Sequence, residues 1–277
     1  MVKKKKREPP PRSKPSEINS ISRALAYASG ASTTQQFAQR LSTALAQKVA
    51  DALRRDFKGI LPDRHGGRHE SLARTSKSVK RLDVNYSTAR LGLALGVSIK
   101  TTNAPEGENN NYAKNVTGRD YELRAEAEDY HERQPYALLI ALYFLPIESC
   151  DNATPRAPSS FGKIAMKMRF RSGRKGPKDL ATLFEAAYIG LYERDGLKKG
   201  HIEFFDAACN PPRSGRPLDT LTFEQMIQRV KASYEERNLT FRFAESPTPV
   251  TAAEVDEPED EAETESEAGA SDDEADE

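Results

Sequence analysis

The sequence has no tryptophan, only two cysteines and no long apolar run. Cys150 and Cys209 lie far apart and form no Cys-x-x-Cys pair, so neither a zinc site nor a disulfide framework is indicated. The longest apolar run, ALLIALYFL at residues 137–145, is about half the length needed to cross a bilayer. No apolar stretch of a signal peptide follows the basic start KKKKREPPPR. We therefore expect a cytoplasmic protein that is neither exported nor embedded in a membrane.

Acidic and basic residues are separated along the chain, although the formal net charge is zero. Residues 244–277 hold 15 of the 42 acidic residues and no Lys or Arg, which leaves 27 acidic against 42 basic residues in 1–243, a net charge of +15. This excess favours a polyanionic partner, most simply nucleic acid. The basic, proline-rich segment 1–16 and the acidic segment 244–277 have little to bury. We expect two disordered tails around a single domain at residues 17–243.

Hydrophobic patterning predicts an α/β (α+β) fold with a mixed sheet between helices. Apolar residues four apart predict a helix over residues 33–57, followed by β-rich segments at 80–88 and 91–101. A helix over 118–134 and a buried strand over 136–146 follow. The last third, residues 147–243, is expected to add an apolar helical face around residues 161–168 and a pair of strands within 187–207. A Thr-x-x-Gln capping box at Thr222 then opens a final helix.

Polar side chains gather at corresponding ends of the two β-rich segments. Alternation along each strand allows Asp83 to converge with Ser98 and Lys100, which share one face. One carboxylate, a main-chain carbonyl such as that of Ile99, and waters form a natural shell for Mg²⁺ or Mn²⁺. A lysine beside such a cation can stabilise charge that develops on a phosphate. The pattern therefore predicts hydrolysis of phosphodiester bonds.

This arrangement resembles the PD-(D/E)xK nuclease superfamily, whose core is helix, strands, helix, strand, with an Asp on one strand and (D/E)-x-K on the next. The resemblance covers about residues 33–146. Here the triplet is Ser98-Ile99-Lys100, so serine stands where the second acid is expected, and Leu82 rather than proline precedes Asp83. A branch of restriction endonucleases in this superfamily has S-x-K and takes the missing acid from the following helix.

The resemblance implies that the helix over 118–134 supplies that acid. Glu122 and Glu126 lie four residues apart on one face of this helix, and Glu126, in mid-helix, is the first choice. Asp83, Ile99 and Glu126 are then the implied metal ligands. The implied activity is that of a restriction-endonuclease-like, Mg²⁺- or Mn²⁺-dependent DNA endonuclease in restriction or anti-phage defence. Such an enzyme is expected to work as a homodimer or larger assembly, or with a partner subunit of a defence system.

An alternative is a non-catalytic nucleic-acid-binding or assembly protein that keeps the fold and has lost the acid, for which Ser98 is the main argument.

A second open choice concerns the basic segment 163–178. Its residues Lys163, Lys167, Arg169 and Arg171 are predicted to contact DNA phosphates, and the alternative is a solvated helix face. His131 and Tyr130, on the same helix as Glu126, are expected to be ordinary surface residues, and the alternative is that they contact DNA or the site.

Overall fold

The computed structural model describes residues 10–12, 17–64, 71–74, 79–88, 92–103 and 111–238, and for 71–74 and 79–80 it describes the backbone. The predicted acidic tail lies outside these residues, as does most of the predicted basic tail. Residues 10–12 lie against the domain, because Pro10 is buried and the main-chain oxygen of Arg12 accepts a hydrogen bond from Arg23 (3.0 Å). The predicted tail therefore contributes a contact to the first helix.

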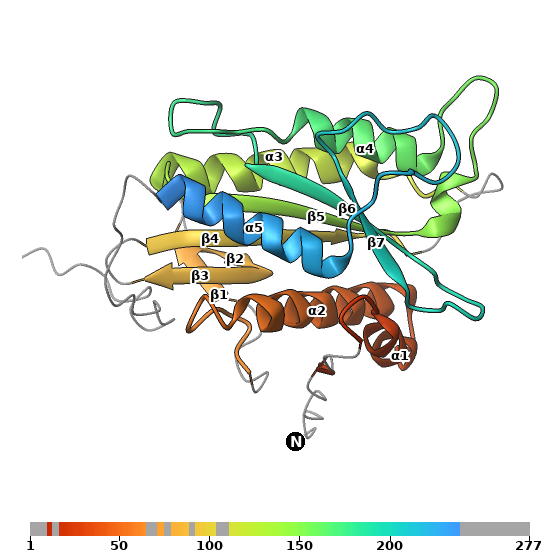
Figure 1. Cartoon of the computed structure of the whole chain (residues 1–277), viewed down its shortest axis with the longest axis horizontal. Coiled ribbons are helices and arrows are strands. Elements are labelled where there is room, and N and C mark those ends of the chain that lie inside the picture. The colour runs from red at the N-terminus through yellow and green to blue at the C-terminus, as the bar shows by residue number, and fades with distance from the viewer. Residues whose placement is uncertain are drawn as a thin grey trace, which may run out of the picture.

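Five strands form one mixed sheet in the order β3-β4-β5-β6-β7, with helices on both faces (Figure 1). These strands are β3 (Val84–Thr88), β4 (Gly92–Thr101), β5 (Leu138–Pro146), β6 (Ala186–Tyr192) and β7 (Ile202–Asp206). The three central strands run parallel, and β3 and β7 are antiparallel to their neighbours. Two short strands, β1 (Ser71–Arg74) and β2 (Val79–Leu82), form a separate antiparallel pair. The predicted mixed sheet between helices is thus confirmed.

The helices divide into two groups by the face of the sheet that they cover (Figure 1). On one face lie α1 (Ser22–Ser29), α2 (Thr34–Leu53) and α5 (Phe223–Asn238). On the other lie α3 (Val116–Arg133) and α4 (Ser160–Phe170), with a single 3₁₀ turn, η2 (Ile147–Cys150), after β5. The sequence predicts all but α1 and η2, and α2 ends at Leu53 rather than at residue 57. None of the described helices is both long and apolar enough to span a bilayer.

Local sequence signals explain where several of these elements begin. Thr33 caps α2 by accepting a hydrogen bond from the main-chain nitrogen of Gln36 (3.1 Å). The predicted capping box precedes α5: Thr222 accepts from the main-chain nitrogen of Gln225 (3.1 Å), and the Gln225 side chain accepts from that of Thr222 (2.8 Å). Both cysteines are free thiols, as the sequence predicts.

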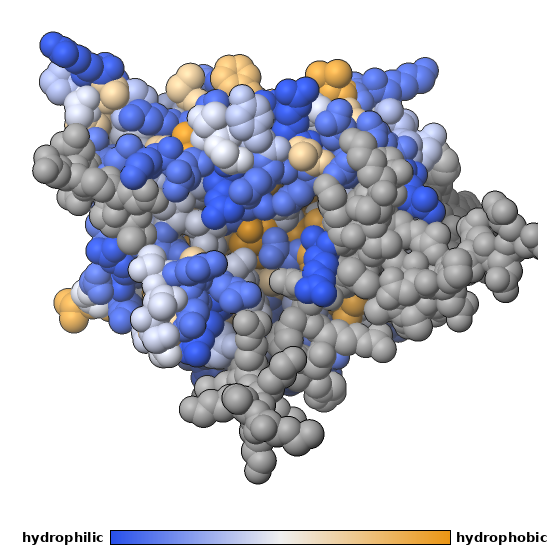
Figure 2. Space-filling view, turned by 180° about the vertical axis from the view of Figure 1, so that it is seen from behind, coloured by the Kyte–Doolittle hydropathy of each residue, from blue (hydrophilic) through white to orange (hydrophobic). Residues whose placement is uncertain are grey.

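Strand β5 separates two hydrophobic cores. All nine of its residues are buried, so the continuous apolar run is a central strand, as predicted. Its even-numbered residues from Leu138 to Phe144 pack with α1, α2 and α5, and its odd-numbered residues from Leu139 to Leu145 pack with α3 and α4. On the side of the molecule opposite to Figure 1, hydrophobic residues are visible near the centre and at separate points along the upper and left edges, with hydrophilic residues between them (Figure 2).

A buried group of charged side chains joins four elements around Glu185, which directly precedes β6. Its carboxylate accepts hydrogen bonds from Arg174, from Arg237 at the end of α5 and from the main chain of Leu139 in β5, at 2.7 to 2.9 Å. His131 of α3 lies 3.4 Å from the same carboxylate and is fully buried. The expectation of a surface histidine is therefore wrong. Burial acts to raise the pKa of Glu185, but His131, the Leu139 N–H and Arg237 outweigh it and lower the pKa.

Lys48 is a second buried charge, and it lies in the other core. Its side chain extends from α2 to the main-chain oxygen of Glu17 (3.3 Å) and lies 4.3 Å from the centre of the Phe223 ring. Only 4% of the residue is exposed. Burial lowers the pKa of Lys48 from 10.5 to about 8, with the charge of Glu17 acting in the opposite direction. The charged form therefore costs folding free energy at neutral pH.

We predict that Lys48→Met stabilises the protein at pH 7 by about 1–2 kcal/mol, because the methionine avoids that desolvation cost but loses the contacts of the ammonium group. The folded-state pKa lies below the unfolded-state value, so the unfolded chain binds more protons between about pH 8 and 10.5. Wild-type stability should rise over this interval, and the advantage of Lys48→Met should shrink. Urea unfolding at pH 7 and pH 9.5 measures both effects. Exposed Lys58→Met is the control, and a pH-independent difference contradicts the prediction.

Candidate active site

Strand β4 places Ser98 and Lys100 beneath helix α3. Leu95, Val97 and Ile99 of this strand belong to the core under α1, α2 and α5. The alternate residues therefore face the opposite side, where α3 crosses over from β4 to the parallel strand β5. Ser98 is 2% exposed, and the side chain of Lys100 is 12% exposed. Both polar groups thus need partners from the helix above them.

Glu126 of α3 is that partner. One of its carboxylate oxygens, Oε2, accepts a hydrogen bond from the Ser98 hydroxyl at 2.5 Å. The other, Oε1, accepts from Lys100 Nζ at 2.6 Å. Glu122, one helical turn earlier, is more distant, with 3.6 Å between its carboxylate and Lys100 Nζ. The structure brings together the two glutamates that the sequence singles out, and Glu126 makes the closer contacts.

Glu122 belongs to the edge of the site rather than to its centre. Its side chain is 48% exposed, and Arg119 donates a hydrogen bond to it at 2.8 Å. Burial acts to raise the pKa of Glu122, but Arg119, and to a lesser extent Lys100, outweigh this effect and lower the pKa. The carboxylate is therefore ionised at neutral pH and adds negative charge beside Lys100.

Asp83 lies at a bend between β2 and β3 rather than within a strand. Leu82 packs in the core under α3 and α4, whereas Val84 packs in the opposite core, so the chain changes face at Asp83. Its carboxylate accepts a hydrogen bond from the main-chain nitrogen of Ile99 at 2.7 Å. The side chain thus continues the β3–β4 pairing that ends at Val84 and Val97. The prediction of an uninterrupted strand through Asp83 is wrong, but the carboxylate does reach the Ser98-Ile99-Lys100 segment.

The oxygen atoms gathered here are of the type that a hard divalent cation binds. Asp83 and Glu126 offer carboxylates, and Ile99 lies between Ser98 and Lys100 with its main chain already in contact with Asp83. In the described part of the chain, no group of three or more His, Cys, Asp or Glu side chains could hold a metal ion.

The predicted DNA-binding residues of α4 lie outside this cluster. Arg171 forms a two-pronged ion pair with Asp120 of α3, at 2.6 and 3.1 Å, and Lys167 lies 3.9 Å from the same carboxylate. Arg169 donates to the side chain of Asn210. Among the described residues, neither Lys163 nor Arg169 forms an ion pair. These two are therefore better placed than Lys167 and Arg171 to accept a phosphate.

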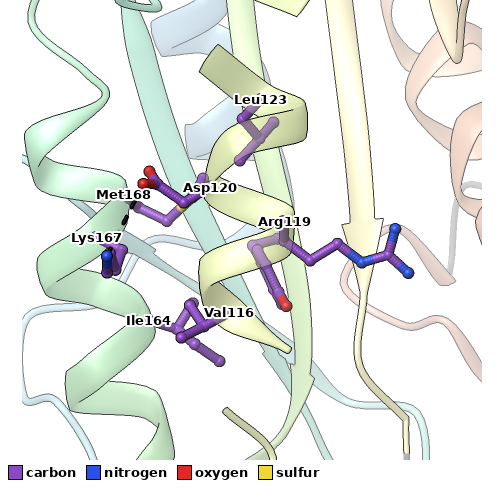
Figure 3. Close-up of a pocket in the computed structure, with 8 residues that line it drawn as sticks. Val116, Arg119, Asp120, Leu123, Ile164, Lys167 and Met168 are labelled. Atoms are coloured by element: carbon purple, nitrogen blue, oxygen red, sulfur yellow. Dashed lines mark ion pairs between the residues drawn. The ribbon is translucent and has the colours of Figure 1, made fainter. Parts of the chain in front are cut away.

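A small cavity separates α3 from α4 beside these ion pairs (Figure 3). Asp120 and Lys167 face each other across it, whereas Arg119 extends away from α4. With a volume of about 10 Å³, the cavity has room for at most one water molecule. It is therefore a packing gap between two helices and not a second ligand site.

Two residues near the cluster, Arg119 and Tyr130, are not among the site residues that the sequence predicts. Tyr130 follows Glu126 by four residues and is 1% exposed, so the expectation of a surface residue is wrong for it too. The spacing of Glu122, Glu126 and Tyr130 was the available signal, because residues four apart share one face of a helix. Arg119 had no comparable signal, since its role depends on where α3 begins relative to β4.

No protein-family model matches the sequence, and no curated protein or solved structure shows significant similarity to it.

We predict that Glu126→Ala destabilises the protein by about 1–3 kcal/mol, because it removes the acceptor of the buried Ser98 hydroxyl and the nearer acceptor of Lys100. A double-mutant cycle with Lys100→Met should give a coupling energy of about 1 kcal/mol or more. Chemical unfolding of the four proteins measures it. Glu128→Ala, two residues further along the same helix and on another face, is the matched control. Equal effects of Glu126→Ala and Glu128→Ala, or strict additivity in the cycle, contradict the contact.

Proposed function

We propose that this protein is a metal-dependent nuclease of the PD-(D/E)xK type that hydrolyses phosphodiester bonds in DNA. The observation that carries the proposal is the meeting of Ser98 and Lys100 of one strand with Glu126 of the following helix, at 2.5 and 2.6 Å. The resemblance to the S-x-K branch calls for such a helix-borne acid. Asp83, which bonds to Ile99 between them, supplies the second acid.

Asp83 and Glu126, with the main-chain oxygen of Ile99, are the proposed ligands of Mg²⁺ or Mn²⁺. The cation would supply Lewis-acid polarisation of the scissile phosphate. Lys100 keeps a positive charge beside the phosphate and stabilises the negative charge that develops on it. Ser98 holds the Glu126 carboxylate in orientation through its hydroxyl. Glu126 is preferred to Glu122 because it contacts both other residues, whereas Glu122 is half exposed and held by Arg119.

DNA is proposed as the substrate because residues 1–243 carry a net charge of +15. Lys163 and Arg169 of α4 are the proposed phosphate contacts among the four predicted basic residues, since Lys167 and Arg171 already face Asp120. Through the same resemblance we propose a role in restriction or anti-phage defence in the cytoplasm. Cleavage of both strands would then use a homodimer, a larger assembly or a partner subunit.

One observation favours a second function, a non-catalytic nucleic-acid-binding protein. Both carboxylate oxygens of Glu126 are already occupied by donors of the chain itself, and Ser98 stands where an acid is expected. A cluster that only joins α3 to β4 would have the same contacts. The two proposals differ in whether a cation can displace these donors, and they therefore predict different results in a cleavage assay.

In the nuclease proposal, wild-type protein with Mg²⁺ or Mn²⁺ cuts plasmid DNA, and EDTA abolishes cleavage. Asp83→Ala, Glu126→Gln and Lys100→Ala should each reduce the rate by about a hundredfold or more, because each removes charge that acts on the phosphate. Single-turnover gel assays measure the rates. Glu128→Gln, on the same helix but outside the cluster, should retain activity within about twofold. Binding without cutting supports the second function, and equal nicking by wild type and all variants shows a contaminating nuclease.

Lys100 and a bound cation compete for the same carboxylate, and this competition gives a prediction that needs no substrate. We predict that Lys100→Met binds Mn²⁺ about tenfold more tightly than wild type, because it removes a positive charge 2.6 Å from a proposed ligand. Isothermal titration calorimetry measures the affinities, with Lys163→Met as the control. Glu126→Gln should bind more weakly than wild type. An unchanged or weaker affinity of Lys100→Met would mean that Glu126 is not a ligand.

A further inference from the structure

Tyr130 carries a buried hydroxyl that forms no hydrogen bond within the described part of the chain. The residue is 1% exposed, and no donor or acceptor of the described residues pairs with its oxygen. An unpaired buried hydroxyl costs about 1–3 kcal/mol relative to one that is paired. Most buried polar side chains in folded proteins have a partner from the protein or from water. The oxygen of Tyr130 is therefore a candidate to hydrogen-bond a ligand.

The position of Tyr130 connects it with the candidate active site. It lies one helical turn after Glu126, on the face of α3 that carries Glu122 and Glu126. Burial is the main cause that raises the pKa of Tyr130, and the charges of Glu126, Asp129 and Asp83 raise it further. Both proposed metal-binding carboxylates thus act on this hydroxyl. At neutral pH the phenol is protonated and can donate a hydrogen bond.

The surroundings of the hydroxyl restrict what its partner can be. The charged groups that raise the pKa of this hydroxyl are the carboxylates of Glu126, Asp129 and Asp83, which attract a cation and repel an anion that arrives alone. A free anion is therefore a poor partner. An oxygen atom that accompanies a cation fits better, because the cation offsets the carboxylates and the oxygen accepts the phenolic proton. That oxygen belongs either to a water of the cation's shell or to a phosphate held by the cation.

We propose that Tyr130 is a positioning residue of this site, whose O–H donates a hydrogen bond to an oxygen that a divalent cation brings between Tyr130 and the carboxylates of Asp83 and Glu126. The inference rests on the proposed function, since it assumes that a cation binds there. The inference adds Tyr130 to the site and gives a reason why its buried hydroxyl has no partner among the described residues. The free protein tolerates the unpaired hydroxyl, and ligand binding supplies its partner.

The test uses Tyr130→Phe, which removes a single oxygen atom. Because that oxygen has no hydrogen-bond partner among the described residues, the free variant should be at least as stable as wild type in thermal unfolding. Its affinity for Mn²⁺ alone, or for Ca²⁺ together with DNA, should nevertheless fall by about three- to tenfold, the effect of one hydrogen bond. Tyr188→Phe, a tyrosine buried in the other core, is the matched control and should bind Mn²⁺ like wild type. Tyr143→Phe, which loses a hydrogen bond with Thr102 (2.9 Å), should instead lower the stability.

Two binding experiments distinguish whether the oxygen that pairs with Tyr130 belongs to water or to a phosphate. If it belongs to water, Tyr130→Phe weakens binding of Mn²⁺ alone. If it belongs to phosphate, the loss appears only when Ca²⁺ and a short DNA duplex with a non-cleavable linkage bind together. Because the chain has no tryptophan, its near-ultraviolet spectrum reports on tyrosine. Ligand binding should therefore give a difference spectrum in wild type and Tyr188→Phe that is reduced in Tyr130→Phe.

The outcomes separate this inference from the proposed function. If wild type binds the cation and cuts DNA, and Tyr130→Phe matches it in affinity, rate and difference spectrum, the role of Tyr130 is refuted and the nuclease stands. If wild type neither binds the cation nor cuts DNA, both proposals fall. A marked loss of stability in free Tyr130→Phe would also refute the inference, because it would show that the hydroxyl has a permanent partner such as a buried water.

Discussion

The carboxylate of Glu126 holds α3 to β4, and the arrangement of the candidate site follows from this contact. Helix α3 must cross over the sheet because it joins two adjacent parallel strands, β4 and β5. An acid on this helix can therefore reach a strand that lacks one. A second acid at position 98 would lie beside Glu126 and repel it, whereas the Ser98 hydroxyl donates a hydrogen bond to it. Serine on the strand and glutamate on the helix are thus complementary.

Periodicity was enough to predict the parts of the site that lie on regular elements. Ser98 and Lys100 share a face because side chains alternate along a strand, and Glu122 and Glu126 share a face because a helix repeats every 3.6 residues. The bend at Asp83 could not be predicted in this way. It depends on the main-chain nitrogen of Ile99 finding a side-chain acceptor after the backbone pairing of β3 and β4 ends.

The sequence could not predict the partners of Lys167, on α4, and of Arg171, directly after it. Lys167 and Arg171 face Asp120 because α3 and α4 pack side by side on one face of the sheet (Figure 1). The same limitation applies to His131, whose buried position depends on Glu185, more than fifty residues later in the chain. Pairing between charged groups of distant segments is decided by tertiary packing. Local patterns predict the elements on which such groups lie, but not which of them meet.

Stability alone gives little reason to keep the cluster around Glu126. Removing charged groups from water costs free energy that their attraction does not always offset, and replacing a buried ion pair by apolar residues is often neutral or stabilising. Here a lysine, a serine and a glutamate occupy positions beneath a helix where apolar residues would pack. Tyr130 adds a hydroxyl that contributes no hydrogen bond to the described protein. Polar groups whose pKa is shifted, or that lack a hydrogen-bond partner, are common where proteins bind ligands. Binding therefore explains the cluster better than stability does, and in the proposed function a cation with its accompanying oxygens would pair with the acids and with Tyr130 together.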